Sequence, residues 1–241
     1  MQLHDITALL EEIAPLELAD ESDSGKIGLV LDRGNNVNMA AVALDPTDYV
    51  LEEAARLGAD LLITHHALIY EPVCRLSKQL SDSLKIALEN EISIYVMHTN
   101  YDRAEGGVND ALVEALNLTD VTRLPSGCVG DIEGTALPDF AAYASQRLNT
   151  HVQFTGTGTI KRVMVLGGSG FRKEYIDIAL DAGADALLSG DLRHDAIRYA
   201  GHLALVDATH YATECPAMRR LCERLPVDSV FIEHDPGIRN L

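Results

Sequence analysis

Two stretches of this chain share one pattern, and that pattern restricts the fold more than any other feature of the sequence. Residues 38–66, NMAAVALDPTDYVLEEAARLGADLLITHH, and residues 161–191, KRVMVLGGSGFRKEYIDIALDAGADALLSGD, each lead from an apolar run through a turn and an amphipathic segment to GAD and a second apolar run. The amphipathic segments have apolar residues at helical spacing, and the short apolar runs are typical of buried strands. Each stretch is therefore predicted to be a βαβ unit with parallel strands.

One more predicted strand follows each unit, ISIYVMH at 92–98 and HLALVDATH at 202–210. The sequence thus predicts an α/β protein of two similar domains, each a largely parallel sheet flanked by helices. A coincidence remains the alternative, because GAD before a strand is common in α/β proteins. The turn-rich region 124–160 favours a boundary near residue 124. We expect the following division: residues 1–123 with about 205–241 as one domain, and about 124–204 as the second.

The composition excludes some classes of partner. Of the 241 residues, 47% are hydrophobic and 23% are charged, as in ordinary globular proteins. No apolar run reaches the roughly 18 residues that a membrane span needs. The net charge of −18 would repel nucleic acid, and the acidic run LADESDS (18–24) is expected to be solvated surface. The acidic N-terminal segment has no signal-peptide pattern, so we expect a cytoplasmic protein without nucleic-acid or membrane partners.

Several common site motifs are missing from the sequence. The cysteines, Cys74, Cys128, Cys215 and Cys222, form no CxxC pair and are expected to be free thiols in a reducing compartment. GGSG at 167–170 follows an apolar run, where backbone N–H groups could hold a phosphate, but it lacks the lysine and spacing of a P-loop. A tight turn is the favoured interpretation. No GxSxG nucleophile motif occurs.

Chemically active residues follow the predicted strands. In open α/β sheets ligands bind outside the carboxyl ends of the strands, and this chain places there the following residues: His65 and His66 after LLIT, His98 and Asp102 after IYVM, Asp191 and His194 after ALLSG, and His210 and Glu214 after ALVDAT. Imidazoles and carboxylates together form the ligand set of Zn, Fe, Mn, Co or Ni. The sequence therefore predicts a metal site at this edge.

Each of these residues also has an ordinary structural interpretation. Neighbouring histidines point to opposite faces of a strand, so His65 and His66 serve one cleft only if the strand ends there; otherwise they cap it. Pro216 favours a helix that begins around residues 214–216, where Glu214 would complement the helix dipole. Asp102, in a loop, could form an Asx turn. Several such coincidences at one sheet edge are less probable than a metal site.

The motifs THH, HTN-x-D-x-x-x-GG-x-N and HYATE, with VLGGSG and SGDLRHDAIRYA, resemble in the same order the Nif-three-like family. Its members are also called dinuclear metal centre hexameric proteins or GTP cyclohydrolase 1 type 2 homologs. The resemblance covers about residues 25–235 and implies two similar α/β domains in a homohexameric ring. It implies two divalent metal ions per chain and the following ligands: His65, His66, Asp102, His210 and Glu214, with Glu214 as the bridge. His98 and His194 correspond to positions near the site.

Two functions are compatible with such a site. A pair of metal ions about 3.5–4 Å apart suits hydrolysis of a phosphoester or opening of a purine ring. The family label suggests GTP as the substrate, with His98 or His194 as proton carrier, but no guanine-reading or triphosphate-binding motif is recognisable. The alternative is a non-catalytic metal-binding ring that stores, delivers or senses metal, or that scaffolds a partner.

Overall fold

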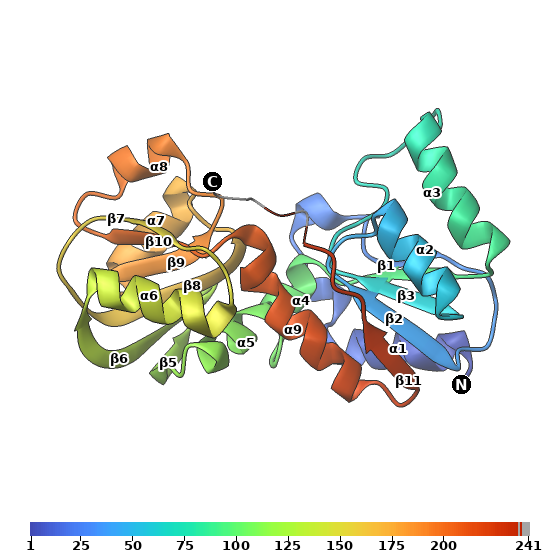
Figure 1. Ribbon diagram of the computed structural model, residues 1–241, viewed down its shortest axis with the longest axis horizontal. Helices are drawn as coiled ribbons and strands as arrows, with labels where there is room; N and C mark the ends of the chain where they lie inside the picture. The colour runs from blue at the N-terminus through green and yellow to red at the C-terminus, as the bar shows by residue number, and fades with distance from the viewer. Residues whose placement is uncertain (236, 238–241) are drawn as a thin grey trace. The chain divides into compact units, whose positions relative to one another are not determined.

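The computed structural model describes residues 1–235 and residue 237, and they form two compact units (Figure 1). Unit 1 contains Met1–Glu105 and the segment from Met218 onward, and unit 2 contains Gly106–Ala217. One helix, α9 (His210–Arg224), begins in unit 2 and ends in unit 1.

Unit 1 is built on one mixed sheet. Its strands are β1 (Gly28–Leu31), β2 (Met39–Ala43), β3 (Leu61–Thr64), β4 (Ser93–Val96) and β11 (Asp228–Phe231). Its helices are α1 (Leu3–Ile13), α2 (Asp48–Arg56), α3 (Lys78–Glu89) and α4 (Thr99–Arg103), with 3-10 turns at Leu16–Leu18 and Glu21–Asp23. Within the described residues the sheet order is β1-β4-β3-β2-β11, and only β1 is antiparallel to its neighbour.

The core of unit 1 follows from the apolar runs of its sequence. Strands β3 and β4 are buried along their whole length, as central parallel strands require. Helix α2 starts at a Thr47 cap that accepts a hydrogen bond from the Val50 N–H at 3.3 Å, and it buries Val50, Leu51 and Ala54. These residues pack with apolar side chains of β2, β3 and β4, so α2 and α3 cover one face of the sheet.

Unit 2 has a parallel centre with antiparallel strands on both sides. Its strands are β5 (Thr119–Arg123), β6 (Cys128–Ala136), β7 (Gln153–Thr155), β8 (Thr159–Ser169), β9 (Ala186–Gly190) and β10 (Ala204–Asp207). Its helices are α5 (Val108–Ala115), α6 (Leu137–Leu148), α7 (Lys173–Asp181), α8 (His194–Tyr199) and the first part of α9. In the described chain the sheet order is β5-β6-β8-β9-β10-β7, with β8, β9 and β10 parallel.

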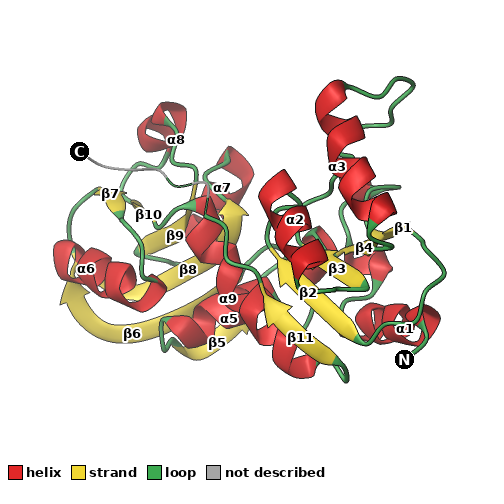
Figure 2. Cartoon of the chain, turned by 45° about the vertical axis from the view of Figure 1, so that its right-hand side comes forward, coloured by secondary structure: helices red, strands yellow, loops and turns green. Residues whose placement is uncertain are grey.

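Helices cover both faces of the unit 2 sheet (Figure 2). One core cluster joins alternate residues of β8, β9 and β10 to Leu112 of α5 and Phe140 of α6. A second cluster joins the intervening strand residues to Ile176 of α7 and Ala196 of α8. The alternation along each strand therefore feeds two cores, which gives the unit three layers.

The two repeated stretches adopt the same structure. β2, α2 and β3 form one βαβ unit, and β8, α7 and β9 form the other. In both, the GAD glycine has a φ of 69°, at Gly58 and at Gly183. The Asp60 carboxylate accepts hydrogen bonds from the backbone N–H groups of residues 38 and 39, and the Asp185 carboxylate accepts them from residues 161 and 162. The prediction of two similar α/β domains is confirmed.

The division between the units differs from the expected one. The first boundary follows residue 105 rather than 123, because β5 pairs with β6 and so belongs to the second sheet. The second boundary follows residue 217 rather than about 204, because β10 lies beside β9. The last segment does return to unit 1, where β11 pairs with β2.

Two further expectations from the sequence concern disulfide bonds and membrane-spanning helices. None of the cysteines in the described part of the chain forms a disulfide. Among the helices of the described residues, none has the length and apolar character needed to cross a membrane.

Candidate metal centre

The paired histidines lie where β3 ends. The backbone N–H groups of His65 and His66 both donate to the Leu44 carbonyl oxygen, at 3.1 and 3.0 Å, so the strand turns here instead of continuing. The His65 side chain is fully buried, and His66 is partly exposed. Their ring centroids are 5.1 Å apart. The two imidazoles therefore lie close together, and do not point to opposite faces as neighbours within a strand would.

His98, which follows β4, completes a group of three imidazoles in unit 1. Its ring centroid lies 5.1 Å from that of His65 and 5.6 Å from that of His66. One ring nitrogen from each histidine lies within 4.8 Å of the others. The sequence resemblance places His98 only near the metal ligands, whereas the geometry makes it a potential ligand. We call His65, His66, His98 and Asp102 the unit 1 cluster.

Asp102 joins the cluster from the short helix α4, not from a loop as expected. Its Oδ1 lies 3.5 Å from His65 Nε2. Helix α4 begins at Thr99, so Asp102 follows His98 by one helical turn and projects from the same face.

Carboxylates hold two histidines of the unit 1 cluster by the Nδ1 atom. His66 Nδ1 lies 2.6 Å from Asp45 Oδ1, and His98 Nδ1 lies 2.8 Å from Asp23 Oδ2. A carboxylate at Nδ1 keeps the proton there and leaves the Nε2 lone pair for a metal or for a proton. Metal-binding histidines in proteins are commonly held in this way.

Asp23 is the more deeply buried of these two carboxylates, with 1% of the residue exposed. Burial by itself would raise the pKa of Asp23, but hydrogen bonds from His98 and Thr99 outweigh it and lower the pKa to about 2. The Thr99 hydroxyl donates at 2.5 Å and its backbone N–H at 3.2 Å. Asp23 is therefore ionised at neutral pH and fixes the orientation of the His98 ring.

Helix α9 carries the corresponding groups of unit 2. It begins at His210, not around residues 214–216, and contains Pro216 in its second turn. The Thr209 hydroxyl accepts a hydrogen bond from the Ala212 N–H at 3.3 Å, and this side-chain contact allows the helix to start early. His210 and Glu214 are consequently one turn apart, and His210 Nε2 lies 3.2 Å from Glu214 Oε2. We call them the unit 2 pair.

The unit 2 pair is held by a carboxylate and by glycines. His210 Nδ1 lies 2.7 Å from Asp191 Oδ2, which repeats the arrangement of unit 1. A Cβ on Gly168 would lie 2.2 Å from Glu214 Oε1, and one on Gly190 would lie 2.4 Å from the His210 backbone nitrogen. Gly168 and Gly190 thus make room for the pair. The expected tight turn at GGSG is wrong, because residues 167–169 continue strand β8, with an irregularity in its pairing with β9 before Ser169.

Some of these residues were not expected from the sequence. Asp23 lies in the acidic run 18–24, which composition assigns to solvated surface, yet its side chain is buried against His98. Asp45 follows β2, as the strand-end rule predicts, but the aspartate beside a proline resembles an ordinary turn. His194 is exposed at the start of α8 and belongs to none of the ligand-type groups found among the described residues.

The chemistry of both sets fits a divalent transition metal. They offer imidazole nitrogens and carboxylate oxygens, and three of the histidines have a carboxylate fixed at Nδ1. Such borderline nitrogen and oxygen donors suit Zn, Fe, Mn, Co or Ni better than Mg or Ca.

Comparisons with known proteins agree with the sequence resemblance. The family model Duf34/NIF3 (NGG1p interacting factor 3) matches residues 1–235. A relative from Methanocaldococcus jannaschii, named GTP cyclohydrolase 1 type 2 homolog, is 32% identical, over 93% of this chain and 95% of its own. A relative of the same name from Clostridium perfringens is 30% identical, over 96% of this chain and 95% of its own.

Solved structures show the same fold. The structure of reduced HcgD from Methanocaldococcus jannaschii has a TM-score of 0.85 at 30% identity, and covers 97% of this chain and 98% of its own. A Bacillus cereus protein related to NIF3 has a TM-score of 0.89 at 23% identity, and covers 100% of this chain and 99% of its own; that likeness shows the fold alone.

Proposed function

Because the chain belongs to the Duf34/NIF3 family, we propose that it binds two divalent transition-metal ions and uses them to hydrolyse a nucleotide or phosphoester. The observation that carries this proposal is the repeated pairing of a histidine Nδ1 with a carboxylate, at His66, His98 and His210. Metal-binding histidines typically have such a partner at the ring nitrogen that does not bind the metal.

We propose five metal ligands, those that the resemblance implies. In this arrangement the ligands are His65, His66 and Asp102 from unit 1, and His210 and Glu214 from unit 2. A glutamate has two oxygens, and Glu214 is the residue expected to bridge the ions, as the resemblance implies.

A bound pair of ions would supply Lewis-acid activation of water and of the substrate oxygen. The chain itself provides the proton transfer. Asp23 holds His98 by Nδ1, so His98 Nε2 is the atom that accepts or returns a proton, or alternatively binds an ion. His194 is the weaker candidate for proton transfer, because it lies exposed on α8.

Relatives of this chain are named GTP cyclohydrolase 1 type 2 homologs, which favours a purine nucleotide as the substrate. The alternative is a non-catalytic protein that stores, delivers or senses metal. Turnover separates them. We expect the metal-loaded protein to convert GTP or p-nitrophenyl phosphate and Asp102→Ala to lose that activity. Tight metal binding without turnover of either compound would support the alternative.

We further propose a cytoplasmic homohexamer, since the resemblance implies a ring. Analytical ultracentrifugation of the metal-loaded protein would give a mass six times the 26.1 kDa of the chain. A monomer at micromolar concentration would contradict this assembly.

The first experiment is the metal content per chain, measured by inductively coupled plasma mass spectrometry on untagged protein. About two ions per chain are expected, and both His66→Ala and Glu214→Ala should reduce that number. His202→Ala serves as the control, because His202 is exposed in unit 2 and has no proposed role.

The pattern of loss tests the ligand set. Full metal content in His66→Ala or in Glu214→Ala would contradict the role of that residue as a ligand. No metal after reconstitution with Zn, Mn or Fe would overturn the proposed function.

A further inference from the structure

We propose that an open groove in unit 1, beside His66, binds a planar uncharged heteroaromatic ring that carries N–H donors, and that it rejects a triphosphate. The groove has a volume of about 730 Å³, within the range of roughly 300–1,000 Å³ found for small-molecule sites. This inference rests on the proposed function, because His66 is both a wall of the groove and a proposed metal ligand. It names the part of the substrate, a purine-like base, that the groove would hold beside the metal centre, with the phosphates of a nucleotide outside the groove.

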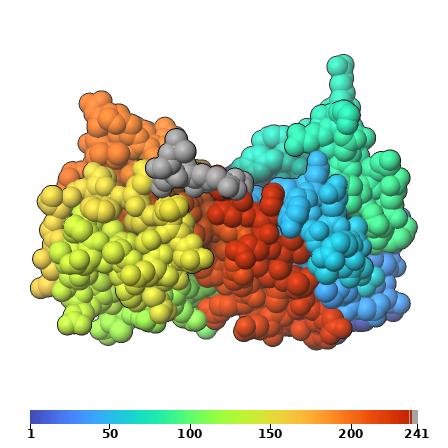
Figure 3. Space-filling view, viewed as in Figure 1, coloured from blue at the N-terminus to red at the C-terminus, as the bar shows by residue number. Residues whose placement is uncertain are grey.

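The groove lies within unit 1. Its walls come from the segment after β2, from α2 and from the first turns of α3, with His234 from the segment after β11. Between β3 and α3, the groove is lined by residues 66–71, Val73 and Ser77. Helices α2 and α3 lie side by side, and their surfaces are seen together in Figure 3 in light blue and blue-green.

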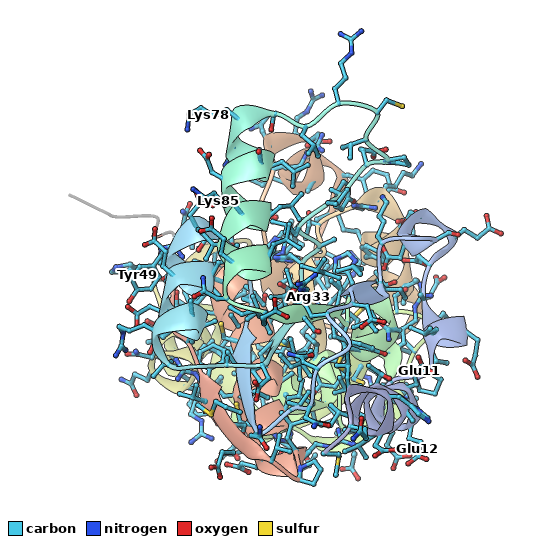
Figure 4. The ribbon with its side chains drawn as sticks, turned by 90° about the vertical axis from the view of Figure 1, so that its right-hand side faces the viewer. Glu11, Glu12, Arg33, Tyr49, Lys78 and Lys85 are labelled. Carbon is cyan, nitrogen blue, oxygen red and sulfur yellow. The ribbon has the colours of Figure 1, made fainter. Side chains whose placement is uncertain are left out.

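An aromatic pair forms one wall. The rings of Tyr49 and His234 have centroids 4.7 Å apart and are tilted by 31°. His234 Nδ1 is hydrogen-bonded to Thr47 Oγ1 at 3.0 Å, which fixes the orientation of the imidazole. Figure 4 shows Tyr49 on α2, and 48% of the residue is exposed. The exposed ring of Tyr49 offers a π face on which a planar heterocycle stacks.

A second tyrosine also lines the groove. Tyr70 is 56% exposed, and Lys26 Nζ lies 3.9 Å from the centroid of its ring. That cation–π contact holds the ring in position on one face. Exposed Val73 adds apolar surface to the lining of the groove. Two tyrosines and an imidazole around an open space are typical of a site for a flat ring.

The polar groups of the groove are acidic. Asp45, Asp48 and Glu71 line it, and none of the described lining residues is a lysine or arginine. The Asp48 carboxylate accepts a hydrogen bond from the Ser83 hydroxyl at 2.5 Å, which fixes its position. Carboxylates accept hydrogen bonds from ring N–H and amino groups, and they repel phosphate oxygens.

The lysines near the groove have partners and do not line it; Lys26 lies over the Tyr70 ring. Lys78 and Lys85 lie on α3 (Figure 4), where each forms an ion pair one turn along the helix, Lys78 with Asp82 and Lys85 with Glu89 at 3.7 Å. They do not line the groove. A triphosphate would therefore meet negative charge here, and this argues for a nucleoside-like ligand in place of its triphosphate.

The test is calorimetric titration of the full-length, metal-free protein with guanosine and with GTP. Metal is removed by a chelator so that phosphates cannot bind through an ion. We expect guanosine to bind at least tenfold more tightly than GTP. Tyr49→Ala should weaken guanosine binding about tenfold, as loss of one stacking partner does. The matched control is Tyr199→Ala, since Tyr199 is 41% exposed on unit 2.

The charge argument has its own variant. Glu71 is exposed, so the Glu71→Lys variant should fold normally. It should reduce the difference between the affinities for guanosine and for GTP. Affinity for GTP equal to or above that for guanosine in the wild-type protein would overturn the proposal. So would a Tyr49→Ala affinity equal to that of the wild type, or the absence of guanosine binding.

Metal content keeps this test separate from that of the proposed function. Tyr49→Ala should hold as many ions as the wild type, because Tyr49 is not a proposed ligand. Guanosine bound in the groove of a protein that never takes up metal would overturn the metal function and support the groove. Full metal content without guanosine binding would support the metal function and overturn the proposal for the groove.

Discussion

Units 1 and 2 have the same succession of elements, but they place their ligand-type side chains differently along it. Counted from the GAD aspartates, His65 and His66 of unit 1 correspond to Gly190 and Asp191 of unit 2. In unit 1 the end of the strand itself carries imidazoles. In unit 2 the same strand end is a glycine, which gives the backbone at His210 the space it needs.

The helices that follow the next strands are more alike. In unit 1, His98 precedes α4 and Asp102 follows four residues later; in unit 2, His210 begins α9 and Glu214 follows four residues later. Both units thus place a histidine and a carboxylate one helical turn apart at the same point of the fold. The comparison teaches that the βαβ framework sets where the ligand-type side chains lie in each unit. The residue at the end of the strand then decides whether the strand supplies such side chains itself, as in unit 1, or leaves space for those of the next helix, as in unit 2.

The largest effect is expected from filling the strand end of unit 2. Gly190→Ala places a Cβ 2.4 Å from the His210 nitrogen and 2.6 Å from its Cα, where backbone atoms must move. We expect the free energy of unfolding to fall by about 3 kcal/mol, the upper part of the usual range for overpacking. Urea unfolding measures the change, and His210 should lose its position for metal.

Its control is Gly183→Ala, because no atom lies within 4 Å of the added Cβ at that position. Equal destabilisation by the two substitutions would show that the close approach at Gly190 does not distinguish the units.

A smaller effect, with a pH signature, is expected at the buried carboxylate of unit 1. The pKa of Asp23 is lowered from 3.8 to about 2, so its ionised form stabilises the fold above the unfolded pKa by about 2 kcal/mol. This contribution is lost as the pH falls from about 3.8 to about 2. Asp23→Asn should therefore be less stable than the wild type at pH 7, and the two should converge near pH 2.

Asp191 tests the same pairing in unit 2. Its side chain is 46% exposed in the ion pair with His210, so Asp191→Asn should change the stability of the metal-free protein by less than about 1 kcal/mol. Similar losses for Asp23→Asn and Asp191→Asn in urea titrations at pH 7 would remove this difference between the units.

Another small effect tests the likeness of the units directly. Gly58 and Gly183 both have a φ of 69° and open space around the missing Cβ. Alanine at either position should cost about 1 kcal/mol, the usual penalty of a left-handed conformation for a residue with a side chain. Thermal unfolding should give matching shifts. A markedly larger loss at one position would mean that the two turns are not energetically equivalent.

The sequence predicts the strands and their ends well, because buried parallel strands read as continuous apolar runs. It therefore locates the histidines of the unit 1 cluster. It misses Asp23, since a buried aspartate in an acidic run has the same composition as a solvated one. It also misplaces the start of α9, because the preference of Pro216 for a first turn is local, whereas the Thr209 cap depends on where β10 ends.

Domain boundaries were the least predictable part. Turn-rich composition favoured a boundary at residue 124, but β5 pairs with β6 across that turn and therefore belongs to unit 2. Which strands pair is not a local property of the sequence.

The pairing of β11 with β2 also sets an order on biosynthesis. Every strand of unit 2 has been translated once the ribosome passes residue 217, whereas the edge of β2 has no partner until residues 228–231 emerge. At about 5–20 residues per second, that edge stays open for roughly 10–40 s after β2 is made. During this time the nascent chain presents a bare apolar strand to its neighbours on the same messenger RNA. A chain whose translation stops before residue 228 would keep the edge of β2 unpaired.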